Sequence, residues 1–190
     1  GEASEEESAD LKKESGDYTG KTKEELLSAF ETLLSTQPVQ IIRNDAEAIK
    51  VAFYKIYRSE TEQLRRQFVE SGGLIEQFVP PTDAAEQRLK ELFAEYRRKR
   101  NEYMARLDEE KEANYRTKLQ IIEELLCEEA DALVLETSVI TAFHKLQKLH
   151  EQWREIGPVA NEYKEPLWDR FREASSKINK RHQEYFDNIK

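Results

Sequence analysis

Few residues in this 190-residue sequence have the types and spacing that perform chemistry. The three histidines, His144, His150 and His182, lack the spacing of metal ligands, and we expect His150, on the apolar side of its helix, to be a core residue. The single cysteine, Cys127, ends an apolar stripe, which predicts a small buried residue rather than a nucleophile. Carboxylates are frequent on any long charged helix, so pairs of acids do not indicate acid–base catalysis. The sequence therefore predicts no enzyme, no metal site and no cofactor.

Binding of an anion, such as the phosphates of a nucleic acid, is the chemistry that the basic residues could support. Basic residues outnumber acidic ones over residues 88–106, and a second, more mixed cluster follows between residues 154 and 181. A solvated helix face with ion pairs four residues apart, such as Glu95–Lys99, explains the same residues. The sequence leaves both interpretations open. The candidate anion or nucleic-acid surface consists of Arg97, Arg98, Lys99, Arg100, Arg154, Arg170, Arg172, Lys177, Lys180 and Arg181.

The amino-acid composition favours long, thin helices. Charged residues make up 36% and hydrophobic residues 38% of the chain, against about 25% and about 45–50% in an average globular domain. Helices that each bury a narrow stripe suit this balance better than a thick core does. Much of the net charge of -9 lies in residues 1–20, where apolar residues are almost absent. We therefore expect residues 1–20 to be a disordered acidic tail.

Apolar residues recur at helical spacing along the rest of the chain, and no segment shows the alternation of a strand. A first helix is predicted to begin at a capping box, Thr22–Glu25, and to end before Pro38. A second is predicted to begin near Asn44 or Asp45, because either residue can cap a helix. The pair Gly72-Gly73 is expected to end that second helix.

The third predicted helix, from about 83 to 130, contains neither Gly nor Pro. A fourth helix is expected to start at Thr137 and to stop at Gly157, and a fifth to start near Pro166. The fold class is therefore all-α: elongated helical hairpins or a bundle, with one long central helix (about 83–130) linking two packed ends. The apolar side of the fourth helix is predicted to consist of Ile140, Phe143, Leu146, His150 and Trp153.

The most specific constellation is a helix–turn–helix corner around residue 157. Gly157 permits the left-handed backbone conformation that often ends a helix, and Pro158 prevents the helix from continuing. Trp153 and Trp168 are expected to pack across the helix crossing. A structural role is the main interpretation, and a surface site for a partner is the alternative. The predicted corner consists of Trp153, Ile156, Gly157, Pro158, Val159, Leu167, Trp168 and Phe171.

The corner also carries a resemblance to a known family. The stretch Trp153-Arg-Glu-Ile-Gly-Pro-Val159, followed by Leu167-Trp-Asp-Arg-Phe-Arg172, resembles the signature of the bacterial family called domain of unknown function 349 (DUF349). The resemblance covers about residues 139–186. Residues 112–133 resemble the charged helix that precedes each unit of that family.

The chain departs from the family pattern just after the corner. Ala160 stands where the family usually has Pro, and Asn161-Glu162 stands where basic residues are common, which weakens the case for an anionic ligand there. The resemblance implies tandem helical units in a longer bacterial, cytoplasmic protein, and it implies no reaction. The first residue, Gly1 rather than Met, agrees with the expectation of a longer protein.

A faint internal repeat supports two helical units. Residues 52–56 (Ala-Phe-Tyr-Lys-Ile) are echoed by residues 142–146 (Ala-Phe-His-Lys-Leu). We therefore predict a disordered acidic tail over 1–20, a degenerate N-terminal helical unit over 21–110, and a unit similar to DUF349, with the corner, over 111–190.

The predicted function is a non-catalytic helical scaffold or adaptor that binds another macromolecule. A nucleic-acid-associated or ribosome-associated protein that uses its basic helix faces is the alternative. We expect an unknown protein partner, with self-association left open, and no small-molecule substrate. No apolar run approaches the roughly 18–20 residues that span a bilayer, so no membrane is expected as a partner. A lone cysteine fits a reducing compartment, and we expect a cytoplasmic protein.

Overall fold

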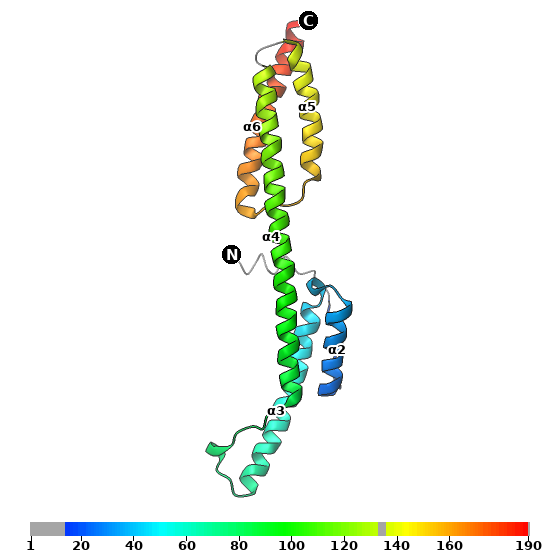
Figure 1. Cartoon of the computed structure of the whole chain (residues 1–190), viewed down its shortest axis with the longest axis vertical. Helices are drawn as coiled ribbons and strands as arrows, with labels where there is room; N and C mark the ends of the chain where they lie inside the picture. The colour runs from blue at the N-terminus through cyan, green and yellow to red at the C-terminus, as the bar shows by residue number, and fades with distance from the viewer. Residues whose placement is uncertain (1–13, 133–135, 190) are drawn as a thin grey trace. The chain divides into compact units, whose positions relative to one another are not determined.

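The chain folds into helices joined by short connections, as the computed structural model shows for residues 14–132 and 136–189 (Figure 1). Every regular element in these two ranges is a helix, which confirms the predicted all-α class. The predicted long helix is also confirmed, as α4. The elements are α2 (Lys23–Thr36), η1 (Val39–Ile41), α3 (Arg43–Glu70), η2 (Ile75–Gln77), α4 (Ala84–Ala132), α5 (Glu136–Glu155) and α6 (Asn161–Ile189).

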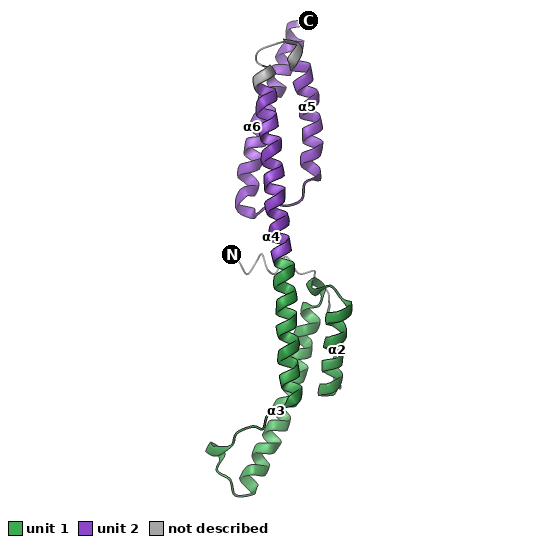
Figure 2. Ribbon diagram, in the orientation of Figure 1, with its two compact units in different colours: residues 1–104 green, residues 105–190 purple. Residues whose placement is uncertain are grey.

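Two compact units divide the chain, unit 1 over residues 1–104 and unit 2 over residues 105–190 (Figure 2). Helix α4 contributes its first part to unit 1 and the remainder to unit 2. The division lies between residues 104 and 105, where the sequence indicated 110 and 111. None of the helices in the described ranges has the length and apolarity that crossing a bilayer requires.

The core of unit 1 lies between α2, the first half of α3 and the start of α4. Phe30 of α2 packs against Phe93 of α4, with ring centres 4.8 Å apart. The predicted capping box starts α2: the Thr22 hydroxyl accepts from the Glu25 amide, and the Glu25 carboxylate accepts from the Thr22 amide. The fully buried side chains of this core include Leu26, Phe30, Ile42, Ile49, Phe53, Leu89 and Leu92.

The prediction that Asn44 or Asp45 caps the second helix is wrong. Helix α3 follows the η1 turn directly and begins at Arg43, so Asp45 falls inside its first turn. The Asp45 side chain is turned inward and is 3% exposed. Its carboxylate accepts hydrogen bonds from the Gly16 amide and the Tyr18 hydroxyl, both at 2.8 Å.

These two hydrogen bonds are made by residues of the predicted acidic tail, Gly16 and Tyr18. Residues 1–13 of that tail lie outside the described residues. Glu14 to Gly20 lie within them, and the segment is held against α3 through Asp45. A prediction of disorder over residues 1–20 from composition alone did not anticipate this attachment, because it involves partners almost thirty residues apart.

The core of unit 2 lies between the second part of α4, α5 and α6. The buried side of α5 is shifted by one residue from the predicted one, since Ile140, Phe143 and His150 are only half-buried. Both stripes share Leu146 and Trp153 and both have helical spacing, so packing decides between them. The side chains of α5 in the core are Val139, Ala142, Leu146, Leu149 and Trp153.

The start of α6 also differs from the prediction. Helix α6 begins at Asn161, and Pro166 lies inside the helix rather than in its first turn. A proline at this place removes one backbone donor near the start of the helix. The buried face of α6 consists of Leu167, Phe171, Ala174 and Ile178.

Candidate functional site

The predicted corner is an elbow of stacked aromatic rings between α5 and α6. Trp153 of α5 stacks on Phe171 of α6, with ring centres 4.4 Å apart, and Trp168 also stacks against Phe171, at 5.7 Å. The two indoles lie 6.4 Å apart. Trp153 is 7% exposed, whereas Trp168 is 43% exposed. The elbow therefore has one buried indole and one at its rim.

The glycine of the elbow acts differently from the prediction. Among the described residues, only Gly20 and Gly72 have a positive φ, so Gly157 does not adopt the left-handed conformation. A Cβ atom at Gly157 would lie 3.0 Å from the Asn114 amide nitrogen. That nitrogen donates a hydrogen bond of 2.8 Å to the Pro158 carbonyl. Glycine is required because α4 approaches the chain closely, not because the backbone is left-handed.

The remaining predicted corner residues lie together at the elbow and differ in exposure. Val159 and Leu167 are buried in the core of unit 2. Ile156 is half-buried and packs against that core, whereas Pro158 is exposed.

A lysine of α4 covers the buried indole. The Lys118 ammonium lies 4.7 Å from the centre of the Trp153 ring, within the range of a cation–π contact. Burial lowers the pKa of Lys118, and the positive charge of Lys164 lowers this pKa further. Asn114 and Lys118 are four residues apart, so one face of α4 contacts both the connection and the tryptophan.

Helix α4 and the part of the elbow that α5 contributes lie in a segment that matches a family model. The model of the family Domain of Unknown Function (DUF349) matches residues 84–162. Residues 84–162 belong to the DUF349 family. The predicted family is thereby confirmed, although the DUF349 segment starts at the beginning of α4 and ends before Leu167 and Trp168. No curated protein and no solved structure matches the chain.

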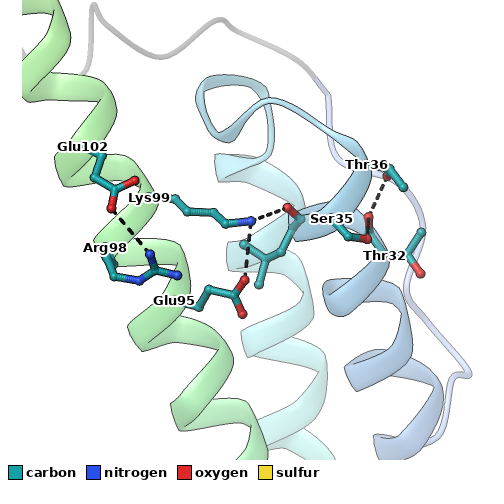
Figure 3. Close-up of polar contacts among 8 residues, drawn as sticks. Thr32, Ser35, Thr36, Glu95, Arg98, Lys99 and Glu102 are labelled. Atoms are coloured by element: carbon teal, nitrogen blue, oxygen red, sulfur yellow. Dashed lines mark hydrogen bonds and ion pairs between the residues drawn. The ribbon is translucent and has the colours of Figure 1, made fainter.

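The first part of the DUF349 segment carries the predicted run of four basic residues in unit 1. The Lys99 ammonium donates to the Leu34 carbonyl at 2.8 Å and pairs with Glu95 at 3.4 Å (Figure 3). Lys99 therefore completes the C-terminal end of α2, where carbonyls lack helical partners. Arg98 pairs with Glu102 at 3.5 Å on the outer face of α4.

The other two residues of the run lie at different angles on the helix. Arg97 is exposed, and Arg100 is half-buried. Consecutive helical residues point about 100° apart, so a run of four cannot form one continuous face.

The predicted basic residues of unit 2 are interspersed with carboxylates. Arg172 pairs with Asp169 at 3.0 Å, and Arg181 with Glu184 at 3.7 Å. Lys177 lies 3.6 Å from Glu129 of α4. Arg154, Arg170 and Lys180 are exposed. The ten predicted residues are divided between the two units and form mixed rather than uniformly basic surfaces.

The residues first considered for chemistry have ordinary packing roles. The His182 ring stacks on Phe143, with centres 3.8 Å apart. His150 lies edge-on to Phe171 at 5.5 Å, and His144 is exposed. Cys127 is exposed, so the prediction of a buried residue is wrong. In the part of the chain that the structure describes, no three His, Cys, Asp or Glu residues are grouped as metal ligands would be.

Sequence reasoning missed a groove on unit 1. Residues 16–21 form one wall and the side of α3 forms the other, and the groove has a volume of about 1040 Å³. Val51, one of its lining residues, is 66% exposed. Charged residues of both signs lie along the rim, among them Glu47 and Lys55. The apolar floor consists of Ala48, Val51, Ala52 and Ile56.

A buried charge cluster at the start of α4 was also missed. The Lys23 side chain is only 9% exposed, and its ammonium binds Asp83 and Glu60, the latter at 2.7 Å. Burial by itself would lower the pKa of Lys23, but the hydrogen bonds to Asp83 and Glu60 outweigh it and the pKa is raised. Asp83 also caps α4, accepting from the Ala85 amide at 2.9 Å. The cluster joins α2, α3 and the start of α4.

Proposed function

We propose that this chain is a non-catalytic, cytoplasmic helical adaptor that binds another protein through the exposed face of α3. The groove along α3 is the observation that supports this function best. Its floor is apolar over residues 48–56, more than two helical turns, in a chain that is 36% charged. A contiguous apolar surface of this kind is typical of a protein-binding site. The exposed thiol of Cys127 agrees with a reducing compartment such as the cytoplasm.

An amphipathic helix is the partner element that fits this groove. The floor residues recur three, four and eight positions apart on α3, which is the spacing that a second helix presents on its own apolar stripe. Two of them, Ala48 and Ala52, are small and allow the backbones to approach closely. The mixed charges of the rim, such as Glu47 and Lys55, would then select the orientation of the incoming helix.

The test begins with a photo-crosslinking amino acid in place of Val51, in the host of the protein, followed by sequencing of the crosslinked peptide. The same amino acid in place of Phe186, an exposed apolar residue of unit 2 outside the groove, is the control. A synthetic copy of the captured peptide is then titrated against the purified chain. We expect a peptide that becomes helical on binding, with Val51→Glu weakening its affinity by roughly tenfold or more. Equal binding by the Val51→Glu variant would overturn the proposal.

Nucleic-acid or ribosome association is the alternative function. The exposure of Arg97, Arg170 and Lys180 supports it. Against it, Lys99 is already engaged with the end of α2. Binding of RNA or DNA in a gel shift at physiological salt, weakening steeply as salt rises and less steeply in the Arg97→Gln variant, would replace the adaptor function.

A further inference from the structure

A second apolar surface of unit 1 lies at the far end of α3, in the last turns of the helix and in the connection to α4. Figure 1 shows this end of α3 and the following connection extending beyond α2. Phe53 is the last fully buried residue of α3, Ile56 and Tyr57 still pack against the core of unit 1, and the last turns of the helix contribute no residue to that core. Large hydrophobic side chains that are 39–79% exposed form this surface, here called the apolar tip: Leu64, Val69, Leu74, Ile75 and Val79.

The connection within the apolar tip is almost uncharged. Residues 71–82 contain one charged residue, Glu76, although charged residues make up 36% of the chain. An exposed, uncharged group of large side chains is the pattern that marks an interaction site.

The tip is held in one shape before any partner arrives. Gly72 has a φ of +97°, and the Gly73 amide donates to the Phe68 carbonyl at 2.9 Å, which closes the end of α3. The Phe68 and Phe78 rings then pack 5.6 Å apart and fix the connection to the helix. A surface that is already ordered loses little conformational entropy on binding.

The rim of the tip carries charges of both signs. Arg65 and Arg66 lie within 3.5 Å of Glu62 on the same helix, and Glu70 and Glu76 follow toward the connection. An isologous pair brings the same patch of two copies together, so a rim with both signs supplies its own complement. Three acidic residues against two basic ones give no attraction to an anionic lipid surface.

We propose that the apolar tip is a self-association site that joins two copies of this chain. Five large exposed side chains on each copy bring the buried surface near the roughly 1,000 Å² at which specific interfaces begin. A dimer of this size is in equilibrium with the monomer and changes with concentration. The apolar tip is separate from the groove on α3. In the proposed function, the groove binds a helix of another protein.

The first experiment is sedimentation equilibrium of the purified 190-residue chain over a wide concentration range. We expect a monomer–dimer equilibrium whose dissociation constant rises by roughly tenfold or more in the Val79→Glu variant, because the dimer would bury that carboxylate. Val51→Glu is the matched control, an exposed valine of the same unit, and it leaves the equilibrium unchanged while weakening the partner helix. Circular dichroism confirms that both variants remain folded.

A charge-reversal experiment tests the two-fold arrangement. One variant carries Arg65→Glu with Arg66→Glu, and the other carries Glu70→Lys with Glu76→Lys. Each is expected to be mainly monomeric alone, and the equimolar mixture is expected to form a heterodimer, since opposite rims then face each other.

Three outcomes overturn this inference. A chain that stays monomeric at every concentration has no such site, and a dimer that survives Val79→Glu uses another surface. Co-sedimentation of the monomer with neutral phosphatidylcholine vesicles, lost in Val79→Glu, would assign the tip to a lipid surface.

Discussion

Two connections between helices contain similar residues but differ in how far other helices cover them. They are residues 71–83 in unit 1 and residues 156–160, at the elbow, in unit 2. Each follows a helix that ends near a glycine, and each contains proline. In unit 2, α4 lies over the elbow and its Asn114 donates to the connection. In unit 1 the connection exposes Leu74, Ile75 and Val79. Glycine and proline thus indicate where a helix stops, but not whether the turn is buried or available for binding.

Gly72 and Gly157, the glycines of these two connections, also differ in what surrounds them. Gly72 has a left-handed backbone and no atom within 4 Å of where a Cβ would lie. Gly157 has an ordinary φ and a side chain of α4 in contact. One glycine is needed for its backbone and the other for the space beside it.

The largest expected effect comes from the covered connection. Trp153→Ala is expected to lower the free energy of unfolding by about 3–5 kcal/mol, because it removes a buried ring stacked on Phe171. Trp168→Ala, at the exposed rim, is expected to cost clearly less. Urea denaturation of both variants measures the difference. Equal losses would contradict the assignment of one buried and one peripheral indole.

Next in size is the backbone effect at the uncovered connection. Gly72→Ala is expected to lower the free energy of unfolding by about 1–2 kcal/mol, the cost of a left-handed residue with a Cβ. Because nothing lies near that Cβ, no second substitution that only creates space should restore the loss. Thermal and chemical denaturation of Gly72→Ala and Gly72→Asn check this, since asparagine tolerates the conformation better.

The dependence of the unfolding free energy on pH tests the ion pair of Asp83, which ends the uncovered connection. Burial would raise the pKa of Asp83, but the hydrogen bond from Lys23, the hydrogen bonds from the Ala85 and Glu86 amides and the positive charge of Lys23 together outweigh it, so this pKa lies below its ordinary value of 3.8. Asp83 therefore stabilises the fold fully above pH 3.8, and this contribution disappears as the pH falls through the lowered pKa.

Asp83→Asn keeps the helix cap and removes the charge. We expect it to cost about 1 kcal/mol at neutral pH, as for a partly exposed ion pair, and nothing at low pH. Glu91→Gln, on the exposed face of α4, is the control. Denaturation of the three proteins from pH 2 to pH 7 gives the comparison, and a constant difference between Asp83→Asn and the parent chain would contradict the ion pair.

The smallest expected change in stability tests most directly why residue 157 is a glycine. Gly157→Ala is expected to destabilise by about 0.5 kcal/mol, because the new Cβ displaces Asn114 while alanine also restricts the unfolded chain. In an Asn114→Ala background the contact is gone, and Gly157→Ala should then stabilise by about 0.4–1 kcal/mol. A double-mutant cycle without this change of sign would contradict the requirement for space at Gly157.

The helices could be predicted largely from the sequence because their signals are local. The capping box at Thr22, the glycines after α3 and the absence of breakers in α4 each act within a few residues. The buried side of α5 was missed by one position, since two stripes with the same period both contain Leu146 and Trp153. Packing against other helices, which no local pattern contains, decided between them.

The sites depended on contacts distant in sequence, and for that reason most of them could not be predicted. Lys23 meets Asp83 across 60 positions, and the two residues carry no motif that links them. Lys99 was assigned to a basic surface, but it donates to a carbonyl of α2 that is 65 positions away. Cys127 was expected to end an apolar stripe and to be buried, yet it is exposed. The elbow was found because its aromatic residues lie close together in sequence.

The carboxylate of Asp45 has a consequence for the groove. Residues 16–21 are one wall of that groove, and two hydrogen bonds to Asp45 hold this segment beside α3. A detached segment would leave α3 as a convex surface with less contact area for an incoming helix. Affinity for a partner would then be linked to how firmly the chain ahead of α2 is fastened, so Tyr18→Phe could weaken binding without altering any residue of the floor.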